Sequence, residues 1–169
     1  MEFAYATAKI SRLDEIVAIY SSAQRFMAEN GNPQWSKGFP NENDIREGIF
    51  GGVLYTVTVN DQIAAVFSVL NFDENYVEID GKWLTDGNYI AVHRVAVAEN
   101  FRGTGAAKYI LEVAAPQLAH SRGRSSIRID THEKNAPMLG LLKRLNFVRC
   151  GIVRLLRDDT LRIAFEKIL

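Results

Sequence analysis

The chain has 169 residues, of which 47% are hydrophobic and 24% are charged, and this size and composition are typical of one globular domain over residues 1–169. Twenty basic residues balance twenty acidic ones, so the charge gives no reason to expect a nucleic-acid partner. The single cysteine, the short polar N-terminus and the lack of an apolar run of membrane length predict a cytoplasmic protein without a disulfide, a signal peptide or a membrane segment.

The first part of the chain alternates between strand and helix patterns. We expect a strand over 3–8, an amphipathic helix from Ser11 to Asn30, a short helix over 43–50, and strands over 54–59 and 63–70. Ser11, with Asp14 three residues later, predicts a capping box for the long helix, and Asn30-Gly31 predicts its end. Asn60-Asp61-Gln62 predicts a turn that joins the two strands as a hairpin.

Two irregular segments carry aromatic residues. Trp35 lies between Pro33 and Pro40, where an indole either covers the core or forms part of a pocket wall. Residues 71–87 contain Trp83 and read either as an extension of the hairpin or as a loop.

The most informative stretch runs from Ile90 to Leu118. A buried strand over 90–97 is followed by Arg102-Gly103-Thr104-Gly105-Ala106-Ala107 and then by an apolar helical pattern. Glycines before a helix expose backbone N–H groups at the positive end of the helix dipole, where a phosphate binds well. The loop is therefore either a phosphate site or an ordinary tight turn.

Two common phosphate-binding motifs do not fit this loop. A P-loop requires Ser or Thr after its lysine, but Tyr109 follows Lys108. The dinucleotide fingerprint requires a third glycine, which neither Ala106 nor Gly123 supplies at the right place.

The remaining elements complete a mixed sheet. The pattern predicts a strand over 126–130 parallel to the strand over 90–97, a helix over 136–144 capped by Asn135, and a closing hairpin over 147–156 and 161–168. Pro116 lies inside the helical pattern that follows the glycine loop, so we expect it to kink or shorten that helix.

The loop and its surroundings resemble the acetyl-CoA pyrophosphate loop of the GNAT superfamily of N-acetyltransferases. The resemblance rests on Arg102-x-x-Gly105-x-Ala107 after Val-Ala-Val, on Ser126–Asp130 and on Asn135-Ala-Pro-Met, and it extends to Leu145–Gly151. It implies an α/β GNAT-like fold whose sheet is mostly antiparallel, with a splayed pair of parallel strands at the CoA site.

The resemblance also implies how acetyl-CoA is held. Backbone groups of Val95 and Val97 would pair with the pantetheine arm, and the loop from Arg102 through Ala107 would hold the pyrophosphate. Asn135 would bond the cofactor side, or act only as a helix cap. The backbone N–H near Val95 would stabilise the oxyanion.

The resemblance leaves the acid and base open. Leu142 stands where the family often has a tyrosine that protonates the departing thiolate, so either another group serves or the protein binds CoA without efficient turnover. His93 is the candidate general base, or else a histidine bonded within the sheet. Three histidines and one cysteine show no metal-ligand spacing, so we expect no metal.

The implied activity is acetyl transfer from acetyl-CoA to a primary amine of a small molecule or peptide, by direct attack in a ternary complex. The alternative is a catalytically weak acetyl-CoA sensor or subunit on the same fold. Candidate acceptor-side residues are Trp35, Trp83, Tyr89, Asp130 and His132, with Glu78 and Asp80 as nearby acidic groups. Because dimers are common among relatives, a homodimer is compatible with the resemblance.

Overall fold

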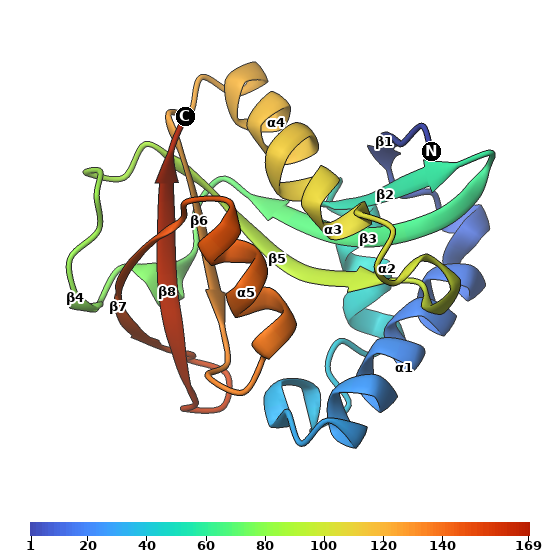
Figure 1. Cartoon of the computed structure of the whole chain (residues 1–169), viewed down its shortest axis with the longest axis horizontal. Coiled ribbons are helices and arrows are strands. Elements are labelled where there is room, and N and C mark those ends of the chain that lie inside the picture. Colours follow the sequence, from blue (N-terminus) through green and yellow to red (C-terminus); the bar gives the residue numbers. More distant parts are fainter.

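The computed structural model describes residues 1–169 and has one mixed sheet with helices on both faces (Figure 1). The eight strands lie in the order β1-β2-β3-β5-β6-β8-β7-β4. They are β1 (Ala4–Thr7), β2 (Leu54–Val59), β3 (Gln62–Leu70), β4 (Asp80–Gly81), β5 (Tyr89–Val97), β6 (Ser126–Thr131), β7 (Val148–Arg154) and β8 (Leu161–Ile168). All neighbouring pairs are antiparallel except β5 and β6. The predicted α/β sheet, mostly antiparallel with one parallel pair, is therefore confirmed.

The helices divide between the two faces. In Figure 1, α1 (Leu13–Glu29) and α2 (Glu42–Phe50) lie behind the sheet, and the helix formed by α3 (Ala106–Tyr109), η5 (Ile110–Ala114) and α4 (Ala115–Ser121) lies in front with α5 (Ala136–Arg144). Four further single turns, η1 (Ile10–Arg12), η2 (Pro33–Trp35), η3 (Glu74–Tyr76) and η4 (Glu99–Phe101), occur in the connections. The apolar faces of the helices pack against β3, β5 and β6 and form one large core.

One predicted helix cap is wrong. Ser11 lies inside the 3₁₀ turn η1, so α1 begins only at Leu13 and Arg12 occupies its cap position without a side-chain hydrogen bond. The capping box occurs instead at α2, where Asn41 accepts from the Asp44 N–H and the Asp44 carboxylate accepts from the Asn41 N–H.

Pro116 alters the hydrogen bonding of the helix locally but does not shorten the helix as expected. The turn over Ile110–Ala114 is π-helical, and the Ala115 N–H bonds the Ile110 carbonyl five residues back. Proline has no N–H to donate to the carbonyl four residues before it, and the wider turn that precedes Pro116 allows the helix to continue without this hydrogen bond. The helix nevertheless runs on to Ser121.

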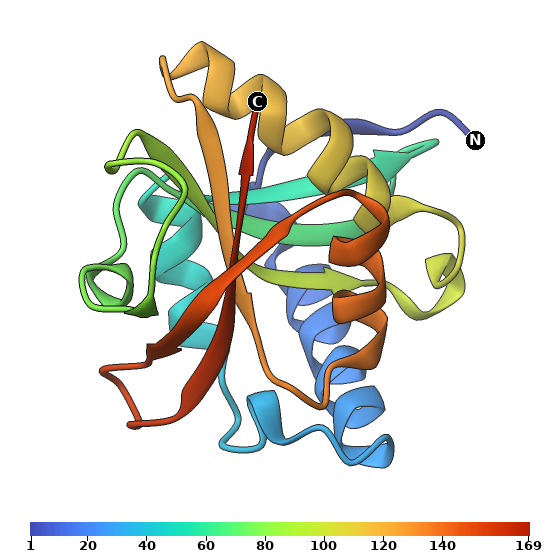
Figure 2. The same cartoon turned by 60° about the vertical axis from the view of Figure 1, so that its left-hand side comes forward.

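The two central parallel strands separate soon after they meet. β5 and β6 pair only over Tyr89–Ala91 and Ser126–Arg128, and beyond that point they diverge, as Figure 2 shows for the yellow-green and orange strands. The segment between β3 and β5, which the sequence left as hairpin or loop, is a loop with one turn (η3) and a short strand (β4) on the far edge of the sheet.

Candidate active site

A bulge in β5 marks the place where the strands diverge. Ser68 of β3 pairs with His93 and Val66 pairs with Ala96, so two residues of β5 face one of β3. Arg94 adopts φ 53°, which is uncommon for a residue other than glycine, and the Tyr20 hydroxyl donates to its carbonyl at 2.9 Å. The bulge leaves Val95 without a partner in β3, and β6 does not extend alongside it.

The glycine loop has free backbone donors. Gly103 and Gly105 have φ 79° and 97°, and Gly105 is the N-cap residue of α3. The N–H groups of Gly103, Gly105, Ala106, Ala107 and Lys108 donate to no backbone or side-chain acceptor within the protein. Such a row of unpaired donors at a helix start fits a phosphate group.

The side chains of this loop are already engaged and leave the backbone donors clear. The Arg102 guanidinium bonds the Ser22 hydroxyl at 2.9 Å and lies over the Phe26 ring of α1. The Thr104 hydroxyl donates to the Phe101 carbonyl at 2.6 Å. A pyrophosphate in this loop would therefore meet mainly backbone N–H groups.

Beside the divergence lies a cavity of about 230 Å³ whose lining includes residues of both α1 and α5. Its apolar wall includes Trp35, Val92, Val95, Ile129 and Met138. Trp35 is buried and packs edge-on against Tyr20, so it both covers the core and forms the cavity wall.

His93 lies on the cavity wall between two carboxylates. Its Nε2 is 2.6 Å from Asp73 Oδ2, although the N–H direction is not aligned for a hydrogen bond, and its Nδ1 is 3.6 Å from Asp130 Oδ2. Burial alone would lower the pKa of His93, but Asp73 and Asp130 outweigh it and the pKa is raised. Burial raises the pKa of Asp73, but His93 and Asn75 more than offset this and the pKa is lowered.

Further polar groups hold this cluster in place. The Tyr76 hydroxyl donates to Asp130 at 2.7 Å, and burial followed by the Asp130 charge raises the Tyr76 pKa well above its ordinary value. Asn75 donates to Asp73 through its backbone and its side chain. The buried Ser68 hydroxyl, directly opposite His93, lines the cavity and has no hydrogen-bond partner in the protein.

Gln34 links the Trp35 turn to the end of β6. Its Oε1 accepts from the Thr131 hydroxyl, the His132 N–H and the Asn135 amide at 3.0–3.1 Å. Asn135 is buried, lines the cavity and caps α5 by accepting from the Met138 N–H. Both readings of Asn135, as a cap and as a side chain at the site, are compatible with this position.

The remaining acceptor-side candidates are divided. Asp130 lines the cavity beside His93 and Trp35, whereas His132 lines a smaller adjoining hollow, where burial and Arg162 lower its pKa. Trp83 and Tyr89 do not line the cavity, and Glu78 and Asp80 are exposed outside it.

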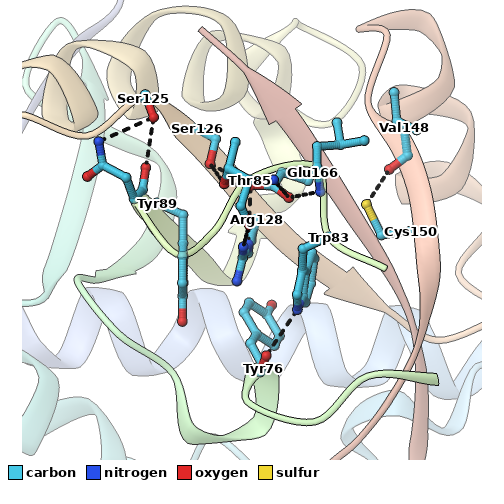
Figure 3. A network of polar contacts seen from close by, with 12 residues as sticks. Tyr76, Trp83, Thr85, Tyr89, Ser125, Ser126, Arg128, Val148, Cys150 and Glu166 are labelled. Atoms are coloured by element: carbon cyan, nitrogen blue, oxygen red, sulfur yellow. Dashed lines mark hydrogen bonds and ion pairs between the residues drawn. The ribbon is translucent and has the colours of Figure 1, made fainter. Parts of the chain in front are cut away.

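Trp83 and Tyr89 instead enclose the Arg128 guanidinium, at 4.2 and 4.0 Å from their ring centroids (Figure 3). Arg128 Nε lies 3.2 Å from the fully buried Glu166 carboxylate. Glu166 also accepts from Ser126, Thr85 and the Leu84 N–H. This network fastens the loop between β3 and β5 to β6 and β8.

The sequence interpretation missed several side chains around the cavity: Gln34, Ser68, Asp73, Asn75, Tyr76, Arg94, Arg157 and Arg162. No periodic pattern marks these residues, but β6 carries a pattern for the neighbouring polar network. Ser126, Arg128 and Asp130 alternate with Ile127 and Ile129 along β6, and this period of two predicts a polar face that contains the buried Arg128–Glu166 network as well as Asp130.

Comparisons with known proteins agree with this geometry. The family model described as "Acetyltransferase (GNAT) family" matches residues 15–147. A crystal structure of a GNAT-family acetyltransferase from Streptococcus agalactiae 2603 is 33% identical, with a TM-score of 0.87, and the match covers 99% of this chain and 95% of that one.

More distant structures share the fold. A GNAT-family acetyltransferase from Listeria monocytogenes 4b F2365 is 19% identical with a TM-score of 0.76, over 100% of this chain and 96% of that one. The ribosomal-protein-S18-alanine N-acetyltransferase from Escherichia coli is 14% identical with a TM-score of 0.61, over 99% and 94%. No curated protein gave a significant sequence match.

Proposed function

This chain belongs to the GNAT family of acetyltransferases, and from this premise we propose that it transfers the acetyl group of acetyl-CoA to a primary amine of a small molecule or peptide. The amine nitrogen attacks the thioester carbonyl directly in a ternary complex, the C–S bond breaks, and CoA leaves as a thiolate that takes a proton from water. The observation that carries the proposal is the cavity at the β5–β6 divergence, which His93 and two carboxylates line together with Val95 of β5.

The residues around the divergence suit acetyl-CoA. The open edge of β5 at Val95 and Val97 would pair with the pantetheine amides, as an added strand does. The unpaired N–H groups of Gly103, Gly105, Ala106 and Ala107 would bind the pyrophosphate. Asn135, on the other side of the cavity, would bond the cofactor arm.

His93 is the base in this proposal. An amine in water carries a proton and must lose it before it can attack, and His93 lines the cavity where the amine would bind. Asp73 and Asp130 raise the His93 pKa and favour the protonated product of that transfer. Bound acetyl-CoA supplies an activated thioester carbonyl, and the Val95 N–H at the bulge would donate to its oxygen as negative charge develops.

A second candidate function follows from Leu142. This residue of α5, at the position where the family often has a tyrosine, is fully buried in the core. Nothing at that position can protonate the thiolate. A protein that binds acetyl-CoA as a sensor or subunit with slow turnover would have the same cofactor site.

Thermal unfolding combined with an assay of CoA release distinguishes the two functions. Thermal unfolding is measured with acetyl-CoA, CoA, ATP and NAD, and CoA release is measured with a panel of amines. A ligand at a hundred times its Kd stabilises a protein by about 2.7 kcal/mol, which raises the Tm by several degrees. We expect a shift with acetyl-CoA and CoA alone, and amine-dependent CoA release; a shift without release would favour the sensor.

A pair of glycine variants tests the loop. Gly105→Glu places a carboxylate among the pyrophosphate donors and should abolish the shift. Gly123→Glu is the control, because Gly123 also has positive φ and open space around its Cβ position but lies beyond the end of α4. If Gly105→Glu still binds acetyl-CoA as tightly as Gly123→Glu, the loop is not the pyrophosphate site.

A further inference from the structure

The cavity contains a second group of charges that acetyl transfer alone does not use. Arg94, Arg157 and Arg162 all line it. The guanidiniums of Arg94 and Arg157 lie over the same Phe39 ring, at 4.6 and 3.6 Å from its centroid. Arg157 and Arg162 also line the smaller hollow that adjoins the cavity.

These three cations are poorly balanced by the protein. Arg157 pairs with Asp158 at 3.1 Å, but Arg94 and Arg162 have no carboxylate within 4.0 Å. Asp130 and Asp158 act on Arg162 only from beyond 4.0 Å, and Asp73 and Asp130 lie closer to His93. Of the three guanidiniums, two therefore lie in a partly enclosed space without a close carboxylate.

Of the three arginines, Arg162 gives the strongest evidence for an anion site. It is only 4% exposed, and a buried charge without a carboxylate in direct contact is costly. Its Nη1 donates to the Thr160 hydroxyl and the Leu161 carbonyl, and its Nη2 donates to the Gln34 carbonyl. Because a guanidinium has about five N–H groups, Nε–H and one Nη2–H remain without an acceptor in the protein.

A small anion is the ligand that such a group recognises. The planar fork of arginine matches the two oxygens of a carboxylate, or the oxygens of a phosphonate or phosphate, better than any neutral group. The same cavity offers the opposite chemistry near His93, where Asp73 and Asp130 favour an ammonium or an amine. The volume of about 230 Å³ suits a small molecule rather than a folded partner.

We propose that the acceptor is a small zwitterionic amine, such as an amino acid or an aminoalkyl phosphonate, whose anionic group binds Arg162 and Arg157 while its amino group lies at His93. This rests on the proposed acetyltransferase function and narrows its acceptor class. Peptide N-termini and polyamines, which have no anionic group near the amine, are then poor acceptors.

Matched acceptors test the anionic group. CoA release is measured for sets of an α-amino acid, its amide and its decarboxylated amine, and for aminoalkyl phosphonates beside the corresponding alkylamines. Because hydrogen bonds to charged groups are among the stronger ones, kcat/KM for the acid should exceed that of its neutral or cationic counterparts by about tenfold or more. Equal or faster turnover of the counterparts overturns this inference and leaves the acetyltransferase function standing; no binding of acetyl-CoA would instead overturn the function itself.

Arginine variants locate the anion. Arg162→Gln and Arg157→Gln should each raise KM for the acid about tenfold or more and leave the amide nearly unchanged, while Arg162→Lys should retain part of the preference. Arg157 is exposed, so its variant remains informative if Arg162→Gln does not fold. Arg154→Gln is the control, since Arg154 lies on the same hairpin and pairs with Asp159 outside the cavity.

Two results of these variants would overturn the proposal. The first is an equal loss for acid and amide, because the arginines would then hold the fold rather than the anion. The second is loss of acetyl-CoA-induced stabilisation in Arg157→Gln or Arg162→Gln, because the guanidiniums would then serve the cofactor.

Discussion

The protonation of His93 follows from its neighbours. Burial disfavours the imidazolium, and the Arg94 charge does so too, but Asp73 and Asp130 favour it more strongly and raise the His93 pKa. Tyr76, whose ring centroid is 5.6 Å from that of His93, orients Asp130 through its hydroxyl. A base in this position is unprotonated only at a pH above its raised pKa.

This geometry predicts a distinctive pH profile. The kcat/KM should rise with pH through a His93 pKa above about 6.5. Asp73→Asn removes one stabilising charge, so the rising limb should move to lower pH. His93→Gln should reduce kcat by about 10²–10⁴-fold and remove the limb. The measurement is the pH dependence of CoA release at saturating acetyl-CoA.

A control in the same loop distinguishes charge from packing. Glu74 is exposed and neighbours Asp73 in sequence, so Glu74→Gln should leave the limb in place. A limb that stays unmoved in Asp73→Asn would contradict the assignment of Asp73 as the residue that positions and charges His93.

Sequence reasoning reached only part of this cluster. His93 and Asp130 could be predicted as site residues because they lie on strands whose order was predictable. Asp73 and Tyr76 lie in the irregular loop after β3, and no local pattern shows that this loop returns over β6. Arg162 lies two residues after the closing turn, and its partner Gln34 is 128 residues away in the chain.

At the scale of elements, the loop between β3 and β5 is held by a buried ion pair. Arg128 and Glu166 lie opposite each other on β6 and β8, and their side chains are 4% and 0% exposed. Trp83 and Tyr89 cover the guanidinium, and the Glu166 carboxylate bonds Leu84 and Thr85 of the loop (Figure 3). Since the same loop carries Asp73 and Tyr76, the network also supports the site.

Arg128→Met should therefore destabilise the protein strongly. It leaves a buried carboxylate without its cation, which typically costs about 3–5 kcal/mol. For a chain of this size the Tm should fall by roughly 2–4 °C per kcal/mol. Arg149→Met, on the exposed side of β7, is the control and should change the Tm little. A similar small change in both variants would show that Trp83 and Glu166 hold the loop without Arg128.

Most elements were predictable, and the exceptions have physical reasons. Hydrophobic period and turn residues gave β2 and β3, β6, α5 and the closing hairpin within a few residues. The β5 bulge was not predictable, because Arg94 with positive φ is stabilised by the Tyr20 hydroxyl and by β3, which are distant in sequence. Ser11 failed as a cap because a preceding 3₁₀ turn includes it.

At the scale of the molecule, a balanced total charge hides an uneven distribution. The chain has equal numbers of acidic and basic residues, yet carboxylates, a histidine and guanidiniums gather in one cavity beside the divergence of β5 and β6. The order of strands and helices sufficed to predict the fold, whereas the composition could not reveal this local concentration. No helix is both long and apolar enough to cross a bilayer.

These charges also fix how stability depends on pH. Burial would raise the pKa of Glu166, but its hydrogen bonds and Arg128 lower it, and the pKa of Asp158 falls to about 2 despite a desolvation effect that would raise it. A lowered pKa contributes stability above the unfolded value near 4, and this stability is lost as pH falls through the folded value. The raised pKa of His93 acts in the opposite direction: its contribution is complete below about 6.5 and is lost as pH rises through the folded pKa.

The Tm should accordingly be highest between about pH 4 and pH 6.5, and it should fall as the pH drops below this range. In Glu166→Gln the neutral amide cannot stabilise Arg128 in the same way, so its Tm should lie below that of the wild type at pH 7. The difference in Tm between the wild type and Glu166→Gln should become smaller as the pH falls from about 4, because protonation also neutralises the wild-type carboxylate. Glu112→Gln, on an exposed helix face, is the control. A gap that stays constant from pH 7 to pH 3 would mean that Glu166 stabilises the fold by shape and neutral hydrogen bonds rather than by charge.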